Sequence, residues 1–227
     1  MHTPSLARST ARASAIALSA LLALCLVAGP TPARAEEPEK LKCPKDAELK
    51  GKRPPQGLKE WCSLPDGTQH GPSVHYYESG KLKARAFFDE GELDGEYQAW
   101  HPNGQLAEAG TYSGDQRRGI FRTWDPNGNQ LTEEPYDDGR IHGVSRIWFP
   151  DGQLMLEVTY SKGARHGPAV TYYENGQKRT EGEFRNDAYH GQWRGWYADG
   201  SPEKVAEFEE GSELSRKTFP PGSGDDG

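Results

Sequence analysis

The sequence predicts an all-β protein: an elongated, twisted, single-layer antiparallel sheet built from six tandem β-hairpin repeats of 24 residues. Three observations support this fold class. Glycines and aromatic residues recur every 24 residues, an Asn-Gly-like dipeptide marks a turn in every unit, and glycine or proline interrupts each stretch that could otherwise form a helix. The 227-residue chain has 27 glycines, 17 prolines and a hydrophobic content of 33%. This composition excludes an enzyme with a large α/β core.

Four columns of residues define the repeat. The first glycine column holds Gly71, Gly95, Gly119, Gly143, Gly167 and Gly191. The turn glycines are Gly80, Gly104, Gly128, Gly152, Gly176 and Gly200. One aromatic column holds Tyr76, Trp100, Trp124, Trp148, Tyr172 and Trp196, and the other holds Phe88, Tyr112, Tyr136, Tyr160, Phe184 and Phe208. Residues 70–213 are therefore expected to form six hairpin units.

Each hairpin is expected to turn at the second glycine column. The dipeptides there include Asn103-Gly104 and Asp151-Gly152, which tolerate the positive φ angles of a two-residue type I′ turn. This turn would pair Glu78 with Lys81 and place Tyr76 opposite Lys83. Looser bends, such as Glu90-Gly91, would then connect one unit to the next.

The two aromatic columns are expected to lie on opposite faces of the sheet. Side chains alternate between faces along a strand, which puts Phe88 on the opposite side from Tyr76. Each face would then carry one aromatic row, stabilised by contacts between neighbouring strands.

The N-terminal 35 residues have the pattern of a secretory signal peptide. Arg8 and Arg12 precede an apolar stretch over 15–28, and Ala33-Arg34-Ala35 is typical of a cleavage site. We therefore expect a secreted or periplasmic protein with no transmembrane segment after the signal is removed. A lipoprotein anchored at Cys25 is the alternative.

The sequence predicts a disulfide-bonded cap before the repeat array and a disordered tail after it. Cys43 and Cys62 remain after signal removal, and an even pair in an exported chain predicts a disulfide that staples residues 36–69 into an N-terminal cap. Such a cap would protect the exposed edge of the first unit. Residues 214–227 are rich in Pro, Gly, Ser and Asp and are expected to be a disordered tail.

The repeat resembles a known family. The units His70-Gly71-Pro72…Tyr76-Tyr77-Glu78-Ser79-Gly80 and His166-Gly167-Pro168…Tyr172-Tyr173-Glu174-Asn175-Gly176 are similar to bacterial MORN-type repeats, in the variant found in YwqK-type antitoxin components. The resemblance covers all six units. It implies a twisted hairpin sheet without enzymatic chemistry, and the family name implies toxin neutralisation.

The histidines of one column raise the question of a metal site. His70, His142, His166 and His190 occupy equivalent positions, but equivalent positions of adjacent hairpins lie two strands apart, roughly 9.5 Å. Zinc needs its ligand nitrogens much closer together. Hydrogen bonds from these histidines to nearby backbone are the favoured interpretation, and we predict no metal and no cofactor.

Catalysis and nucleic-acid binding are also disfavoured. The chain shows no nucleophile elbow, phosphate-binding loop or H-E-x-x-H pattern, so we expect no enzyme activity. Removal of the three arginines in residues 1–35 changes the net charge from −7 to −10. A chain this acidic is not expected to bind nucleic acid through its phosphates.

The aromatic columns are the feature with most potential for function. Stacked Trp and Tyr rings stabilise a sheet, and this structural role is the simpler explanation. A long strip of partly exposed rings also suits a docking surface. We therefore predict an interaction scaffold that binds a protein through Tyr76, Trp100, Trp124, Trp148, Tyr172 and Trp196. The alternatives are an antitoxin or immunity protein and a cell-envelope module that binds a glycan or lipid.

Overall fold

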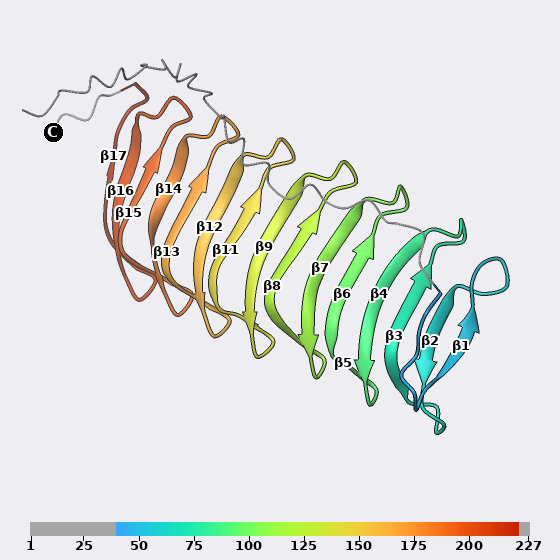
Figure 1. Ribbon diagram of the computed structural model, residues 1–227. Coiled ribbons are helices and arrows are strands. Elements are labelled where there is room, and N and C mark those ends of the chain that lie inside the picture. The colour runs from blue at the N-terminus through green and yellow to red at the C-terminus, as the bar shows by residue number, and fades with distance from the viewer. Residues whose placement is uncertain (1–39, 223–227) are drawn as a thin grey trace, which may run out of the picture. The chain divides into compact units, whose positions relative to one another are not determined.

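The computed structural model describes residues 40–222, and these form one open antiparallel sheet of seventeen strands (Figure 1). Apart from the short pieces β5 and β10, each strand pairs with the next one along the chain, so the sheet is a meander. Two of the long strands are interrupted, and β4 and β9 each pair with both pieces. The predicted all-β, single-layer fold is confirmed, with no helix among residues 40–222. The predicted signal peptide, its predicted cleavage site and Cys25 lie outside the described residues.

The strand bounds follow the repeat. The cap contributes β1 (Glu48–Lys52) and β2 (Lys59–Ser63). The first three units contribute β3 (Gln69–Tyr76), β4 (Leu82–Asp89), β5 (Glu92–Leu93), β6 (Gly95–Trp100), β7 (Leu106–Ser113), β8 (Gln116–Trp124) and β9 (Gln130–Asp137). The last three contribute β10 (Arg140–Ile141), β11 (Gly143–Trp148), β12 (Leu154–Ser161), β13 (Ala164–Tyr172), β14 (Lys178–Arg185), β15 (Ala188–Trp196), β16 (Pro202–Glu209) and β17 (Ser212–Thr218).

The predicted turn type is wrong at the second glycine column. In the first unit, the Gly80 N–H donates to the Tyr77 carbonyl and the Tyr77 N–H donates to the Lys81 carbonyl, both at 2.9 Å. Gly80 has φ +83°, whereas Ser79 has no positive φ, so this is a three-residue loop: a type I turn followed by a left-handed glycine. All six units repeat this geometry. The turn glycines are therefore in turns as predicted, but not in type I′ turns.

The type I′ geometry occurs instead at the opposite edge of the sheet, between units. Glu90 and Gly91 have φ +45° and +94°, and they connect the paired residues Asp89 and Glu92. The bends expected to be loose are thus the tight two-residue hairpins. Two left-handed residues are needed there because the strands on either side pair right up to the turn.

The longer loop changes the register but keeps the two faces. Tyr76 pairs with Leu82 and not with Lys83, because a bulge falls between His75 and Tyr76. Phe88 pairs with Gly71, and alternation along β3 places Gly71 and its partner on the opposite side from Tyr76. We call the face that carries Tyr76, Trp100, Trp124, Trp148, Tyr172 and Trp196 the Trp face, and the other the Phe/Tyr face.

Both ends of the array extend the sheet. The disulfide between Cys43 and Cys62 is present, as predicted, and the cap strand β2 pairs along β3. At the other end, β17 runs to Thr218 and pairs with β16. Residues 214–218, expected in a disordered tail, therefore form the last strand of the sheet. Their backbone finds partners in β16 although the composition is polar.

Candidate functional site

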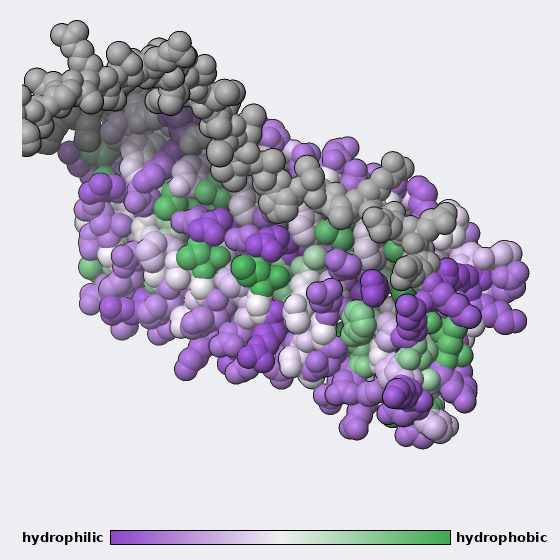
Figure 2. All heavy atoms as spheres, in the orientation of Figure 1, coloured by the Kyte–Doolittle hydropathy of each residue, from purple (hydrophilic) through white to green (hydrophobic). Residues whose placement is uncertain are grey.

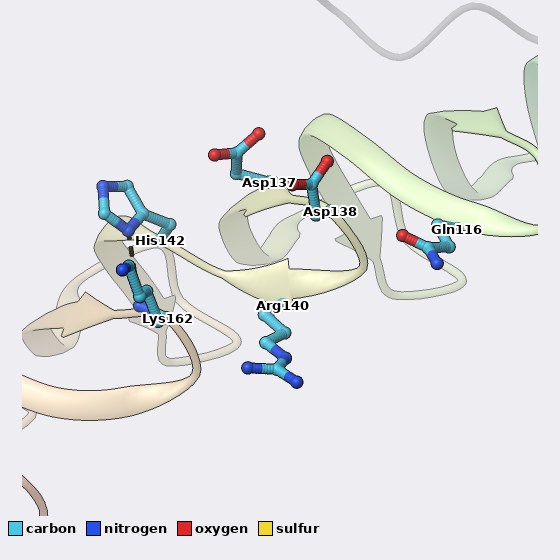
Figure 3. Close-up of a pocket in the computed structure, with 6 residues that line it drawn as sticks. All are labelled: Gln116, Asp137, Asp138, Arg140, His142 and Lys162. Atoms are coloured by element: carbon cyan, nitrogen blue, oxygen red, sulfur yellow. Dashed lines mark hydrogen bonds between the residues drawn. The ribbon is translucent and has the colours of Figure 1, made fainter.

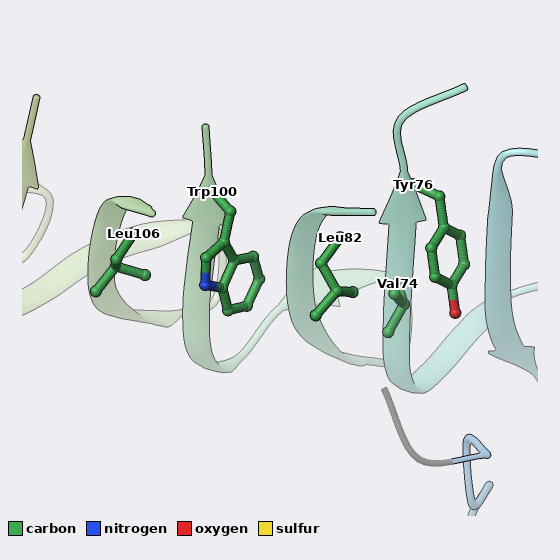
Figure 4. Close-up of a cluster of buried hydrophobic side chains, with 5 residues drawn as sticks. All are labelled: Val74, Tyr76, Leu82, Trp100 and Leu106. Atoms are coloured by element: carbon green, nitrogen blue, oxygen red, sulfur yellow. The ribbon is translucent and has the colours of Figure 1, made fainter. Parts of the chain in front are cut away.

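The first two members of the predicted interaction face belong to the protein core. Tyr76 is 3% exposed and Trp100 is 7% exposed, and they form a buried cluster with Val74, Leu82 and Leu106 (Figure 4). The Tyr76 hydroxyl donates to Glu60 Oε2 at 2.9 Å. Burial, together with this contact to Glu60, raises the pKa of Tyr76 to about 12. These two rings therefore stabilise the fold and are not available to a partner.

The remaining members of the column are more accessible. Trp124 packs against the edge of the same buried cluster, while Trp148, Tyr172 and Trp196 are half-buried. Leu82 and Leu106 belong to the buried cluster of the first two units, whereas Tyr172 pairs with Lys178 and Trp196 pairs with Pro202. Trp148 is half-buried although it pairs with Leu154, so the paired residue alone does not set the exposure of the ring.

A row of charged side chains lies beside this column on the Trp face. The Arg122 Nε contacts Glu133 at 2.9 Å, and the Arg146 guanidinium contacts Glu133 at 3.4 Å and Glu157 at 2.7 Å. These residues lie across from one another on β8, β9, β11 and β12. Positive and negative side chains thus alternate along the row, and their charges compensate one another within the sheet. Sequence reasoning missed it because the pairing depends on register.

The Phe/Tyr face carries the second aromatic column in a packed arrangement. Phe121, 1% exposed, makes edge contacts with Tyr112 and Tyr136 at centroid distances of 5.3 and 5.4 Å. Arg117 lies over the Phe121 ring at 4.5 Å and contacts Glu108 at 2.7 Å. Further along, Val158, Ala169 and Phe184 form a second buried cluster. On the face shown in Figure 2, apolar patches are separated by hydrophilic side chains.

Tyrosines next to the Trp column tie successive turns together. The Tyr77 hydroxyl donates to the Trp100 carbonyl at 2.7 Å, and the Tyr173 hydroxyl donates to the Trp196 carbonyl at 2.9 Å. Each bond joins one unit to the next along the same edge of the sheet. These two hydroxyls therefore satisfy backbone carbonyl groups at the neighbouring turn.

Two of the column histidines bond to backbone, as favoured from the sequence. His70 Nδ1 accepts from the Glu90 N–H at 3.4 Å, and His142 Nδ1 accepts from the Lys162 N–H at 3.3 Å. Within residues 40–222, no group of three or more His, Cys, Asp or Glu side chains could hold a metal. Each of these two histidines thus accepts an N–H from the first residue of the type I′ turn that follows its unit.

A polar pocket of about 530 Å³ opens at this edge of the sheet (Figure 3). It is lined by Gln116, Asp137, Asp138, Arg140, His142 and Lys162. In the figure, the Arg140 side chain points away from the carboxylates of Asp137 and Asp138. The charged groups therefore do not converge on one point, as a reaction centre would require.

Four segments of the chain match the MORN repeat variant family: residues 69–90, 93–113, 141–162 and 165–186. Residues 69–186 contain four MORN-variant repeats. The matched segments correspond to the first, second, fourth and fifth hairpin units of the 24-residue spacing, and the third and sixth units have the same turn geometry. The MORN repeats thus form a β-sheet scaffold whose turns stack along both edges.

Solved structures with similar chains are distant. A chain of the Glycosylation Associate Protein complex from Streptococcus agalactiae has a TM-score of 0.22 and 15% identity, over 62% of this chain and 22% of that one. A chain of the GtfA/B complex bound to UDP and GlcNAc has a TM-score of 0.21 and 11% identity, over 63% of this chain and 25% of that one. This chain thus spans a quarter or less of either protein, and scores this low carry no conclusion about its function. No curated protein matches the chain. Residues 40–222 contain no helix long and apolar enough to cross a membrane.

Proposed function

We propose that this protein is an exported, non-enzymatic scaffold that binds a protein partner through the C-terminal half of the Trp face. The observation that carries the proposal is the contrast along one aromatic column. Tyr76 and Trp100 are buried, whereas Trp148, Tyr172 and Trp196 are half-buried and lie on consecutive hairpins. Large, rigid rings that are partly exposed in a row are the side chains that most often anchor protein interfaces.

The surroundings of these rings also suit a protein interface. Arg146 and Arg194 precede Trp148 and Trp196 by two residues and lie on the same face. Interfaces combine aromatic anchors with arginine and a polar rim. A single-layer sheet held together by hairpin stacking can offer such a broad face without a second layer to cover it.

The test is partner capture by chains that differ at one ring. The protein, purified after export with its disulfide intact, is used to capture partners from envelope extract, and bound proteins are identified by mass spectrometry. We expect one stoichiometric partner that is lost with Trp148→Ser and retained with Tyr189→Ser. Tyr189 is a fair control because it is 42% exposed on the Phe/Tyr face. Loss with both variants, or with neither, would contradict the proposal.

The resemblance to YwqK-type antitoxin components makes a toxin one class of partner within this proposal. An antitoxin acts by binding, so the same face would serve. Expression of the captured partner would then arrest growth, and co-expression of the wild-type chain but not Trp148→Ser would restore it. A captured partner without toxicity would exclude the antitoxin role and leave the scaffold role intact.

A further inference from the structure

The repeat places an arginine at the same position of the Trp face in three units, but only two of them have a carboxylate partner in the same register. Arg122 and Arg146 bond through Nε to the glutamates eleven residues later, Glu133 at 2.9 Å and Glu157 at 2.7 Å. Arg194 is the equivalent residue of the sixth unit, and the residue eleven positions later is Val205. Arg194 and Val205 face each other across β15 and β16, as the two ion pairs do on their own strands.

The other neighbours of Arg194 do not replace the missing carboxylate. Its Nε donates to the Gln192 side-chain oxygen at 2.8 Å. Glu181 lies across from it on β14, but the Glu181 carboxylate accepts from Lys178 Nζ at 2.7 Å. Among residues 40–222, no acidic group lies within ion-pair distance of the Arg194 guanidinium, whose side chain is exposed.

A hollow of about 260 Å³ occupies the place where this carboxylate would sit. It is lined by Gln192, Arg194, Gly195, Trp196, Pro202, Lys204, Val205 and Phe219. Trp196, Pro202 and Phe219 make one wall apolar, while Arg194 supplies a cation beside it. Lys217 adds a second cation close by, since its Nζ lies 4.6 Å from the centre of the Phe219 ring. The third cation of the region, Lys204, lies 3.7 Å from Glu203, so Arg194 and Lys217 are the cations beside the hollow that have no ion-pair partner among residues 40–222.

We propose that this hollow binds an aspartate or glutamate side chain of a partner polypeptide, with an adjacent apolar residue packed against Trp196 and Phe219. The partner carboxylate would take the position that Glu133 and Glu157 hold in the third and fourth units. The planar guanidinium suits this role because it can donate two parallel hydrogen bonds to one carboxylate. The inference rests on the proposed scaffold function and names the chemistry of the partner at one end of the Trp face.

A polypeptide fits the hollow better than an acidic glycan does. The groups that occupy the equivalent place in the other units are glutamate side chains projecting from a strand. The apolar wall offers few hydrogen bonds for sugar hydroxyls, and unpaired hydroxyls would disfavour a glycan there. An acidic glycan remains an outcome that the experiment can detect.

The test uses short blocked peptides and the full exported chain. The probe is acetyl-Gly-Phe-Glu-Leu-Gly-amide, and the matched probe has Gln in place of Glu. Binding is followed by the NMR shift of the Trp196 indole N–H, assigned with Trp196→Phe. We expect the Glu peptide to bind at least about tenfold more tightly than the Gln peptide, because a hydrogen bond to a charged group contributes more than a neutral one.

Three variants decide the assignment. Arg194→Gln should reduce affinity for the Glu peptide about tenfold, to that of the Gln peptide. Val205→Glu should reduce it as well, because the introduced carboxylate would occupy Arg194 as Glu133 occupies Arg122. Arg122→Gln is the matched control and should bind like wild type. Retained amide dispersion in all three spectra shows that the sheet is folded.

Several results would overturn the inference. Equal binding of the Glu and Gln peptides, no binding at millimolar peptide, or full binding by Val205→Glu would each exclude a carboxylate site at Arg194. Binding of trigalacturonate but not of the Glu peptide would show that the ligand of this hollow is an acidic glycan and not a polypeptide. Partner capture that is lost with Trp148→Ser but unchanged in Arg194→Gln and Val205→Glu would keep the scaffold function and reject this site. Absence of any captured partner would reject the scaffold function. The peptide titration does not depend on that result and would still show whether Arg194 binds a carboxylate.

Discussion

The two halves of the sheet use the same repeat, but only the N-terminal half buries a hydrophobic cluster on the Trp face, whereas both halves bury side chains such as Phe121 and Phe184 on the Phe/Tyr face. In the N-terminal half, Val74, Tyr76, Leu82, Trp100 and Leu106 form a buried cluster on the Trp face. In the C-terminal half, the buried cluster of Val158, Ala169 and Phe184 lies on the Phe/Tyr face, supported by Trp193. The C-terminal half of the Trp face is therefore left with half-buried rings. A repeat unit thus specifies where aromatic residues lie but not whether the Trp face is buried.

Substitution of the same column position in each half should give the largest difference. Trp100→Ala should destabilise the protein by about 3–5 kcal/mol, because it removes a buried ring and leaves a cavity. Trp196→Ala should cost much less, about 1 kcal/mol, since part of its ring already contacts solvent. Urea unfolding followed by circular dichroism measures both. Equal losses would show that the column is equally structural along its length.

On the Phe/Tyr face, a glycine lies under an aromatic ring in both halves. A Cβ at Gly110 would lie 2.5 Å from the Phe121 ring, and one at Gly182 would lie 2.2 Å from the Trp193 ring. Gly110→Ala and Gly182→Ala should therefore each destabilise by about 1–3 kcal/mol through overpacking. Adding Trp193→Ala to Gly182→Ala should recover part of the loss if the ring is the cause. If the stability losses of Gly182→Ala and Trp193→Ala simply add in the double variant, contact with the Trp193 ring is not the cause of the destabilisation.

The smallest expected effect is at the Tyr76 hydroxyl. Tyr76→Phe should cost about 1 kcal/mol, because Glu60 loses one donor and keeps Arg53 at 2.6 Å. Tyr172→Phe is the matched change in the exposed half and should cost less.

The same substitution should change the dependence of stability on alkaline pH. The pKa of Tyr76 is raised to about 12, so the folded state holds this proton more tightly than the unfolded chain, whose tyrosines titrate near 10. Its contribution is complete below pH 10 and is lost as the pH rises from 10 to 12. Wild type should lose more stability over this range than Tyr76→Phe. Parallel stability curves would show that the hydroxyl is not shielded from water.

Much of the architecture could be predicted from spacing alone, and the errors came from turns with similar signatures. Asn-Gly and Asp-Gly occur in type I′ turns, but also in the longer loop found here. In that loop the Asn103 and Asp151 side-chain oxygens accept N–H groups two residues later. The true type I′ turns carry mixed pairs such as Glu90-Gly91 and Asn186-Asp187, which are weak signals. The pairing of the flanking strands, not the dipeptide, selects the turn.

The sequence by itself determined the period, the hairpin architecture, the opposite faces of the two aromatic columns and the Cys43–Cys62 pairing. These follow from chain-local rules: a fixed repeat, alternation along a strand and two cysteines that remain after a predicted signal peptide. Only the tertiary structure decided that Tyr76 is core while Trp196 is accessible, and that Arg194 faces Val205 where Arg122 faces Glu133. Burial and charge pairing depend on cross-strand neighbours, and those neighbours are set by a register that bulges shift.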